Sequence, residues 1–189
     1  MSKNIMIVGV GGQGSLLASK LLGNVLLECG YEIKLSEVHG MSQRGGSVVT
    51  YVKYGDKVYS PVIDKGEADY IVSFEALEAA RWLEYLSDNG KIIVNTQQIY
   101  PMPVITGAMK YPENIIPKLS DKADTIAVDA LALAKEAGNV KAVNTVLMGV
   151  LSQNMDIDID KWEAALVKTI PEKLLEINKK AFELGRNYK

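Results

Sequence analysis

The sequence predicts an α/β fold with a Rossmann-like, mostly parallel sheet, an inserted β-hairpin and a helical C-terminal layer. Short apolar runs alternate with helical periodicity up to about residue 138, the pattern of strands joined by crossover helices. From about residue 140 to residue 189, only helical patterns remain. The length of 189 residues fits a single domain that spans residues 1–189.

The first three elements form a β-α-β unit. Residues 5–8 are a continuous apolar run, as expected for a strand that is buried on both faces of a parallel sheet. Residues 15–29 carry apolar side chains at three- and four-residue spacings, which predicts a helix that Gly30 ends. Residues 32–36 alternate and predict a second strand. Such a unit implies a parallel pair with a right-handed crossover.

A β-hairpin is predicted next, as an insertion at about residues 47–60. Residues 47–54 have strong β propensity, and residues 55–57 are turn formers. Residues 58–60 can return as the second arm, which Pro61 ends. Insertions at strand ends tend to carry function or contacts.

The alternation of strands and helices then resumes. We predict strands at residues 70–74, 91–95 and 124–128, helices at residues 75–86 and 130–137, a turn at Asn89–Gly90, and a helix that is introduced by residues 111–113 and reaches Leu119. Residues 99–107, with two prolines, are predicted to be irregular or an edge strand. In the C-terminal part we predict three helices. The first spans residues 145–153, the second begins at an Asp160 cap, and the third spans residues 172–186 with Pro171 in its first turn.

Charge and composition exclude several classes of function. The chain has 21 Lys+Arg and 23 Asp+Glu, a net charge of −2, which disfavours a nucleic-acid partner. No apolar run reaches the roughly 18 residues of a membrane span, so we expect no membrane partner. No signal peptide precedes the first strand, and we therefore expect a cytoplasmic protein.

The chain is poor in metal ligands. Its one cysteine, Cys29, cannot hold an iron–sulfur cluster, which takes about four thiolates. Its one histidine, His39, excludes a multi-histidine metal site. We therefore predict no metal site, and any redox chemistry must come from a cofactor or a partner.

The glycine loop has the dinucleotide fingerprint. Gly9, Gly11 and Gly14 form G-x-G-x-x-G between a strand and a helix, and Glu37 lies just beyond the next strand, where a ribose-binding acid is expected. In that motif the glycines permit a tight turn, a close approach to the ligand, and close helix–sheet packing. A stand-alone NAD(P)- or FAD-binding oxidoreductase is thus one hypothesis. The other is that this strand–turn–helix connection binds no ligand. Gln13 is an unusual residue for a pyrophosphate cradle and could reach a ligand or a partner chain.

A second loop concentrates unusual residues. Residues 36–47 include an acid, the only histidine, an amide, an arginine and three glycines. Arg44, flanked by Gly45–Gly46, can present its guanidinium to a carboxylate or a phosphate. His39 is a possible acid or base. Alternatively, the glycines only shape the turn and the polar side chains are solvated.

These two loops carry a family resemblance. Residues 8–14 read Val-Gly-Val-Gly-Gly-Gln-Gly, and residues 36–48 read Ser-Glu-Val-His-Gly-Met-Ser-Gln-Arg-Gly-Gly-Ser-Val. Together they resemble the gamma-type subunit of 2-oxoacid:ferredoxin oxidoreductases, in particular the small (beta) subunit of the indolepyruvate enzymes. The likeness extends to residues 68–75 and 181–185, and so over essentially the whole chain.

The resemblance implies an enzyme subunit that is not active alone. Such enzymes oxidatively decarboxylate a 2-oxoacid, here an arylpyruvate, with coenzyme A as co-substrate and ferredoxin as electron acceptor. Thiamine diphosphate, Mg and iron–sulfur clusters are implied on the large (alpha) partner subunit, and no cofactor is implied to bind tightly to this chain. The implied task of this chain is to complete the active enzyme and to supply part of the coenzyme A or substrate surface.

We predict cofactor-binding residues from their places at strand ends. No catalytic residue is predicted, and His39 is the one candidate for such a role. The predicted binding residues are Gly11, Gly12, Gln13, Gly14, His39, Gln43, Arg44 and Asn95. Asn95 and the following Thr96 rest on topology alone. A further hypothesis is a non-catalytic assembly subunit, or a homodimer of the isolated chain, with an aromatic interface. Its candidate anchors, which could equally be core residues, are Trp82, Trp162, Tyr51, Tyr54 and Tyr59.

Overall fold

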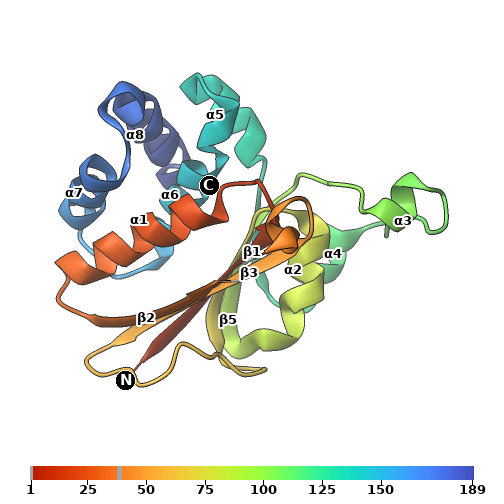
Figure 1. Cartoon of the computed structure of the whole chain (residues 1–189), viewed down its shortest axis with the longest axis horizontal. Helices are drawn as coiled ribbons and strands as arrows, with labels where there is room; N and C mark the ends of the chain where they lie inside the picture. The colour runs from red at the N-terminus through yellow and green to blue at the C-terminus, as the bar shows by residue number, and fades with distance from the viewer. Residues whose placement is uncertain (1, 38–39) are drawn as a thin grey trace.

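The computed structural model describes residues 2–37 and 40–189, which fold around one mixed sheet (Figure 1). Across these residues the sheet has six strands in the order β2-β3-β1-β4-β5-β6. The strands are β1 (Lys3–Val10), β2 (Glu32–Glu37), β3 (Ser47–Gly55), β4 (Ala68–Ser73), β5 (Leu86–Asn95) and β6 (Asp124–Val128). Strands β1, β4, β5 and β6 pair in parallel, whereas β3 is antiparallel to both of its neighbours. The predicted α/β class is confirmed.

Helices cover both faces of the sheet. The α-helices are α1 (Ser15–Glu28), α2 (Ala76–Trp82), α3 (Met102–Ile105), α4 (Ile115–Ser120), α5 (Ala130–Ala137), α6 (Val143–Asn154), α7 (Ile159–Thr169) and α8 (Glu172–Arg186), and the 3₁₀ helices are η1 (Met41–Gln43), η2 (Leu83–Tyr85) and η3 (Val140–Ala142). Helices α1 and α5 to α8 pack on one face, and α2 and α4 pack on the other (Figure 1). None of the helices in the described ranges is long and apolar enough to cross a membrane.

The alternation of side chains along β1 explains the two hydrophobic layers. Ile5 and Ile7 are buried in the cluster under α1 and the C-terminal helices. Met6 and Val8 are buried in the cluster under α2 and α4. Because neighbouring side chains of a strand point to opposite faces, a strand covered on both sides must be apolar at every position. The continuous apolar run predicted this central strand correctly.

The predicted hairpin at residues 47–60 is wrong in its second arm. Residues 56–60 form no strand, and β3 pairs instead with β2 on one side and β1 on the other. The hairpin therefore consists of β2 and β3. Strand β3 has buried side chains on both faces, with Val52 in the cluster under α1 and Val49 in the cluster under α2, as is typical of a strand inside a sheet that is covered on both sides. Strands β1 and β2 consequently point the same way without being paired, contrary to the predicted parallel pair.

The predicted helix at residues 75–86 and the turn at Asn89–Gly90 also need correction. Helix α2 ends at Trp82, and β5 already begins at Leu86, so both turn residues lie inside a strand. The pairing of β4 with β5 shifts register between Ala68 and Tyr70. A Cβ at Gly90 would lie 2.6 Å from the Ala68 carbonyl oxygen, so glycine permits this close approach.

The C-terminal layer is helical as predicted, with small shifts at the helix starts. Helix α7 begins after Asp158 rather than at an Asp160 cap, and Pro171 precedes α8 as its N-cap residue. Residues 102–105, predicted to be irregular or strand, form the short helix α3.

Candidate functional site

Two loops meet at the carboxyl end of β1. The glycine loop, residues 10–14, leads from β1 into α1, and the second loop, residues 40–46, leads into β3. Parallel strands present their carboxyl ends at one edge of the sheet, where ligands of open α/β folds bind. Val38 and His39 lie outside the described residues, so the suggested role of His39 stays a prediction.

The two loops are bonded to each other through Gly11. Its N–H donates to the Gly46 carbonyl oxygen (2.8 Å), and its own carbonyl accepts from the Gly45 N–H (3.2 Å). A Cβ at Gly11 would lie 2.3 Å from the Ser42 carbonyl oxygen. The missing side chain of Gly11 therefore makes room for the second loop of the same chain.

The other fingerprint glycines also serve internal packing. Gly9 lies within β1, where a Cβ would meet the Phe74 Cβ at 2.9 Å. Gly14, in the left-handed region at φ +92°, lies against Asn144 of α6 rather than against the sheet. The tight-turn role expected of Gly9 and the helix–sheet packing role expected of Gly14 are therefore wrong, whereas a role of Gly14 in binding stays a prediction.

Glu37, the acid of the dinucleotide fingerprint, is hydrogen-bonded within the protein and lies further from the glycine loop than in a Rossmann fold. The Glu37 carboxylate accepts a hydrogen bond from the Ser19 hydroxyl (2.7 Å). Strand β3 separates β2 from β1, which moves Glu37 one strand spacing of about 4.8 Å further from the glycine loop than in a Rossmann fold. The second loop also occupies the space beside Gly11 that a pyrophosphate would need. The residues present therefore do not fit an NAD(P) or FAD site.

Gln13 holds the glycine loop in shape. Its side-chain oxygen accepts from the Val10 N–H (2.7 Å), and its amide donates to the Phe74 carbonyl oxygen (3.0 Å). The side chain thus ties the glycine loop to the residue that follows β4. Gln13 also lines the second cavity described below, so its predicted role in binding stays a prediction.

Asn95 joins the same internal network. Its side chain is fully buried, donates to the Phe74 carbonyl oxygen (3.1 Å) and accepts from the Ala130 N–H at the start of α5 (3.2 Å). Topology placed Asn95 correctly at the carboxyl end of β5, but this side chain lines neither cavity beside the glycine loop.

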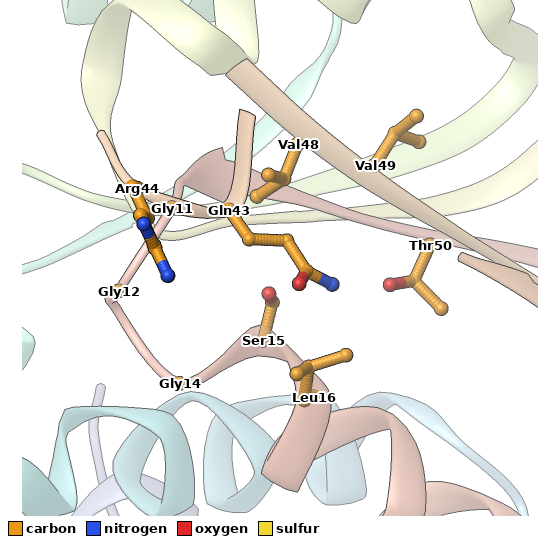
Figure 2. Close-up of a pocket in the computed structure, with 10 residues that line it drawn as sticks. All are labelled: Gly11, Gly12, Gly14, Ser15, Leu16, Gln43, Arg44, Val48, Val49 and Thr50. Atoms are coloured by element: carbon orange, nitrogen blue, oxygen red, sulfur yellow. The ribbon is translucent and has the colours of Figure 1, made fainter. Parts of the chain in front are cut away.

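The loop cavity, of about 390 Å³, lies between the glycine loop, the second loop and β3 (Figure 2). In Figure 2 the side chains of Gln43 and Ser15 both point into this space. It is lined by Gly11, Gly12, Gly14, Ser15, Leu16, Gln43, Arg44, Val48, Val49 and Thr50. The structure thus brings together five of the predicted binding residues: Gly11, Gly12, Gly14, Gln43 and Arg44.

The polar end of the loop cavity carries positive potential. Helix α1 begins there with no side-chain cap and no acidic residue in its first turn, and its first two residues, Ser15 and Leu16, line the cavity. Arg44 is exposed, and within the described part of the chain no ion pair or side-chain hydrogen bond holds its guanidinium. An anionic group is the ligand that this arrangement favours.

A second cavity, of about 520 Å³, lies on the other side of the glycine loop. It shares Gly12 and Gly14 with the loop cavity and is bounded by Lys141 and Asn144 near the start of α6. Sequence reasoning missed this wall because α6 lies about 130 residues away along the chain. It also missed Ser15, although the position directly after the fingerprint was a usable signal.

Metal and cluster ligands are scarce. No group of three or more His, Cys, Asp or Glu side chains in the described ranges could hold a metal ion. Cys29 is half-buried at the end of α1, and burial raises the pKa of its thiol, which disfavours the thiolate that binds metals. These residues do not fit an iron–sulfur cluster or the magnesium of thiamine diphosphate.

The sequence matches a known family over almost its whole length. Residues 4–188 fit the family model of pyruvate ferredoxin/flavodoxin oxidoreductase. The chain belongs to this family. The indolepyruvate oxidoreductase subunit IorB of Pyrococcus horikoshii is 43% identical over 188 residues, which are 96% of this chain and 93% of that protein. The family resemblance drawn from the two loops is therefore confirmed.

Solved structures of this oxidoreductase family have the same fold. The pyruvate oxidoreductase subunit PORC of Thermotoga maritima superposes with a TM-score of 0.75 at 23% identity, covering 97% of this chain and 94% of that one. The 2-oxoglutarate:ferredoxin oxidoreductase of Magnetococcus marinus superposes with a TM-score of 0.74 at 16% identity. That match covers 98% of this chain but only 30% of the other, so there the fold is one part of a longer polypeptide.

Proposed function

We propose that this chain is the small subunit of an indolepyruvate:ferredoxin oxidoreductase. The complex would convert an arylpyruvate and coenzyme A into an acyl-CoA and CO2, passing the released electrons to ferredoxin. The observation that carries the proposal is the 43% identity to the Pyrococcus horikoshii subunit across nearly the full length of both chains. A cytoplasmic location is part of the proposal.

A large (alpha) subunit would supply the redox groups. One cysteine and one histidine are too few to bind iron–sulfur clusters, so this chain would be inactive alone. Thiamine diphosphate and its Mg would likewise reside on the large subunit, where the thiamine supplies the carbanion chemistry of decarboxylation. The Magnetococcus marinus likeness supports this division, because that chain is about three times as long as the part this fold covers.

The loop cavity would bind an anionic group of coenzyme A or of the substrate. The first N–H groups of α1 and the guanidinium of Arg44 attract a phosphate or carboxylate, and the Ser15 hydroxyl can donate to it. Gly12 leaves the backbone of the glycine loop open to that ligand. Val48 and Val49 form the apolar wall. Gln13 and Asn95 would act indirectly, by holding the loops in place.

The test is a reconstituted complex. The chain is co-expressed with a candidate large subunit, and indolepyruvate- and CoA-dependent dye reduction is measured. We expect Arg44→Ala to raise the KM for coenzyme A roughly tenfold or more, because a charge-assisted hydrogen bond contributes about 1.5–3 kcal/mol. Lys20→Ala, which removes an exposed cation from α1 that does not line the loop cavity, is the matched control.

The two parts of the proposal fail separately. A wild-type complex without indolepyruvate activity would contradict the subunit assignment. An active complex in which Arg44→Ala and Lys20→Ala have the same KM for coenzyme A would remove Arg44 from the binding site.

A further inference from the structure

An exposed apolar segment projects from the body of the protein. The arm, residues 99–111, follows β5 and includes α3, which stands away from the sheet in Figure 1. Its large apolar side chains are 53–66% exposed, namely Tyr100, Met102, Ile105 and Met109. Contiguous exposed apolar surface on a soluble fold marks an interaction site more often than chance.

The arm lacks the charges of a solvated loop. Residues 100–110 contain one charged residue, Lys110. A groove of about 590 Å³ lies beside the arm, lined by the apolar Tyr100, Val104 and Met109 and by polar residues that include Gln98, Lys110 and Glu113. The surface therefore offers exposed apolar side chains beside a groove of mixed polar and apolar lining, the combination that protein–protein interfaces show.

The backbone of the arm is ordered by its own hydrogen bonds. The N–H groups of Val104 and Ile105 both donate to the Pro101 carbonyl oxygen, and the Met109 N–H donates to that of Pro103 (2.9 Å). The two prolines also restrict the backbone. A segment ordered before binding loses less conformational entropy when a partner docks.

A single buried carboxylate holds both ends of the arm. Glu75 is 1% exposed, and its Oε1 accepts from the Ile99 N–H (3.1 Å) and from the Tyr111 hydroxyl (2.5 Å). Its other oxygen accepts from the Glu78 N–H (2.8 Å) and so caps α2. The exposed segment is thus fastened at both roots to the layer that packs on the sheet, and it projects as a fixed element.

The arm is continuous with the candidate site. Tyr100, Pro101 and Met102 share a small cavity of about 140 Å³ with Gly45–Ser47, which end the second loop. Across it, the Ser47 hydroxyl donates to Glu78 (2.5 Å), which also pairs with Arg81 (3.1 Å). A molecule that covers the arm would therefore also contact the loop that carries Arg44.

We propose that the arm is the docking element for the large subunit. This inference rests on the proposed function. The redox groups that this chain cannot bind must reach the carboxyl edge of the sheet, and the arm is the apolar surface that adjoins that edge. A second copy of this chain would bring no thiamine or cluster ligands there, so the large subunit is the occupant that the position favours.

The test measures binding of the full-length chain to the purified large subunit by calorimetry. The double variant Met102→Ser/Ile105→Ser removes two exposed apolar side chains of the arm, and Leu27→Ser/Val167→Ser, each 57% exposed on α1 and α7, is the matched control. We expect the arm variant to weaken binding roughly tenfold or more. The control variant should bind like wild type, and both should keep the wild-type circular dichroism spectrum.

Three outcomes separate the inference from the proposed function. Equal affinity of the arm variant and wild type would overturn the docking role. Sedimentation showing a wild-type homodimer that the arm variant abolishes, with large-subunit affinity unchanged, would assign the arm to a second copy and also overturn it. A wild-type chain that does not bind the large subunit would instead contradict the proposed function.

Discussion

Gly11→Ala tests whether contact between the two loops builds the loop cavity. The added methyl group would lie 2.3 Å from both the Ser42 carbonyl oxygen and the Gln43 carbonyl carbon, against an ordinary contact distance of at least 3.4 Å. The second loop must therefore retreat by about 1 Å, because its backbone, unlike a flexible side chain, cannot rotate away. That retreat moves the loop that carries Gln43 and Arg44.

The expected loss of stability has two parts. Overpacking of this kind costs about 1–3 kcal/mol. Stretching the two backbone hydrogen bonds between Gly11 and Gly45–Gly46 costs about 1 kcal/mol more. A total of about 2–4 kcal/mol lowers the Tm of a chain of this size by roughly 5–15 °C.

The assays are thermal unfolding of the isolated chain and the KM for coenzyme A of the reconstituted complex. Gly30→Ala is the control: at φ +80°, with no heavy atom within 4 Å of the added Cβ, it strains only the backbone at the end of α1. We expect both variants to lose stability and only Gly11→Ala to raise the KM. A Gly11→Ala protein with wild-type Tm and wild-type KM would refute the reasoning.

Three further predictions follow from single contacts. Gln13→Leu should lower the free energy of unfolding by about 1–3 kcal/mol in urea titrations, because the Val10 N–H loses its side-chain acceptor, whereas the Phe74 carbonyl oxygen keeps its hydrogen bond from Asn95. Gly185→Ala should lower the free energy of unfolding by at least about 1–3 kcal/mol, because its Cβ would lie 2.0 Å from the Val146 carbonyl oxygen. Gly23→Ala, in open space on α1, should instead raise the free energy of unfolding by about 0.5–1 kcal/mol. The free energy of unfolding should fall as pH rises above 10, where the tyrosines of the unfolded chain ionise. The reason is that burial raises the pKa of Tyr54 and of Tyr111 in the folded protein, and Glu75 raises that of Tyr111 further. Tyr54→Phe and Tyr111→Phe should each make the free energy of unfolding less dependent on pH in this range.

Strand positions were predictable where burial on both faces requires a continuous run of apolar residues in the sequence. The apolar runs of β1, β4 and β5 identified these strands because both of their faces are covered. Pairing partners were harder to predict. The residues of β3 satisfy a hairpin with residues 58–60 as well as an insertion between β1 and β2, and only tertiary packing decides between the two.

The candidate site was predicted in position and only partly in detail. Strand-end topology brought Gly12, Gln43 and Arg44 to one cavity, because parallel strands share a carboxyl edge. The inward turn of Gln13 and the burial of Asn95 depend on the Phe74 carbonyl oxygen, a backbone group that has no signature in the sequence. Asn95 thus matters for the shape of the site, whereas Gln13 both shapes the glycine loop and lines the second cavity.

The aromatic residues show the same limit. Trp162 is fully buried against Phe182 and Tyr54 is buried beside Tyr31, so neither can anchor an interface. Tyr59 is 81% exposed, as an anchor requires. The arm was missed because residues 99–107 were interpreted from their prolines as irregular. Their lack of charge was the signal that could have found this surface.

The position of β3 explains why a dinucleotide fingerprint stands in a chain that does not use it for a dinucleotide. In a Rossmann fold the second strand lies beside the first, and the space above the glycine loop is open to pyrophosphate. Here β3 occupies that neighbouring place, and the second loop that leads into it is drawn onto Gly11. The missing Cβ of Gly11, which in a Rossmann fold makes room for a phosphate, here makes room for the backbone of the second loop. The meaning of the motif therefore depends on which strand lies beside the first, and in this fold the loop cavity is built by the glycine loop and the second loop together.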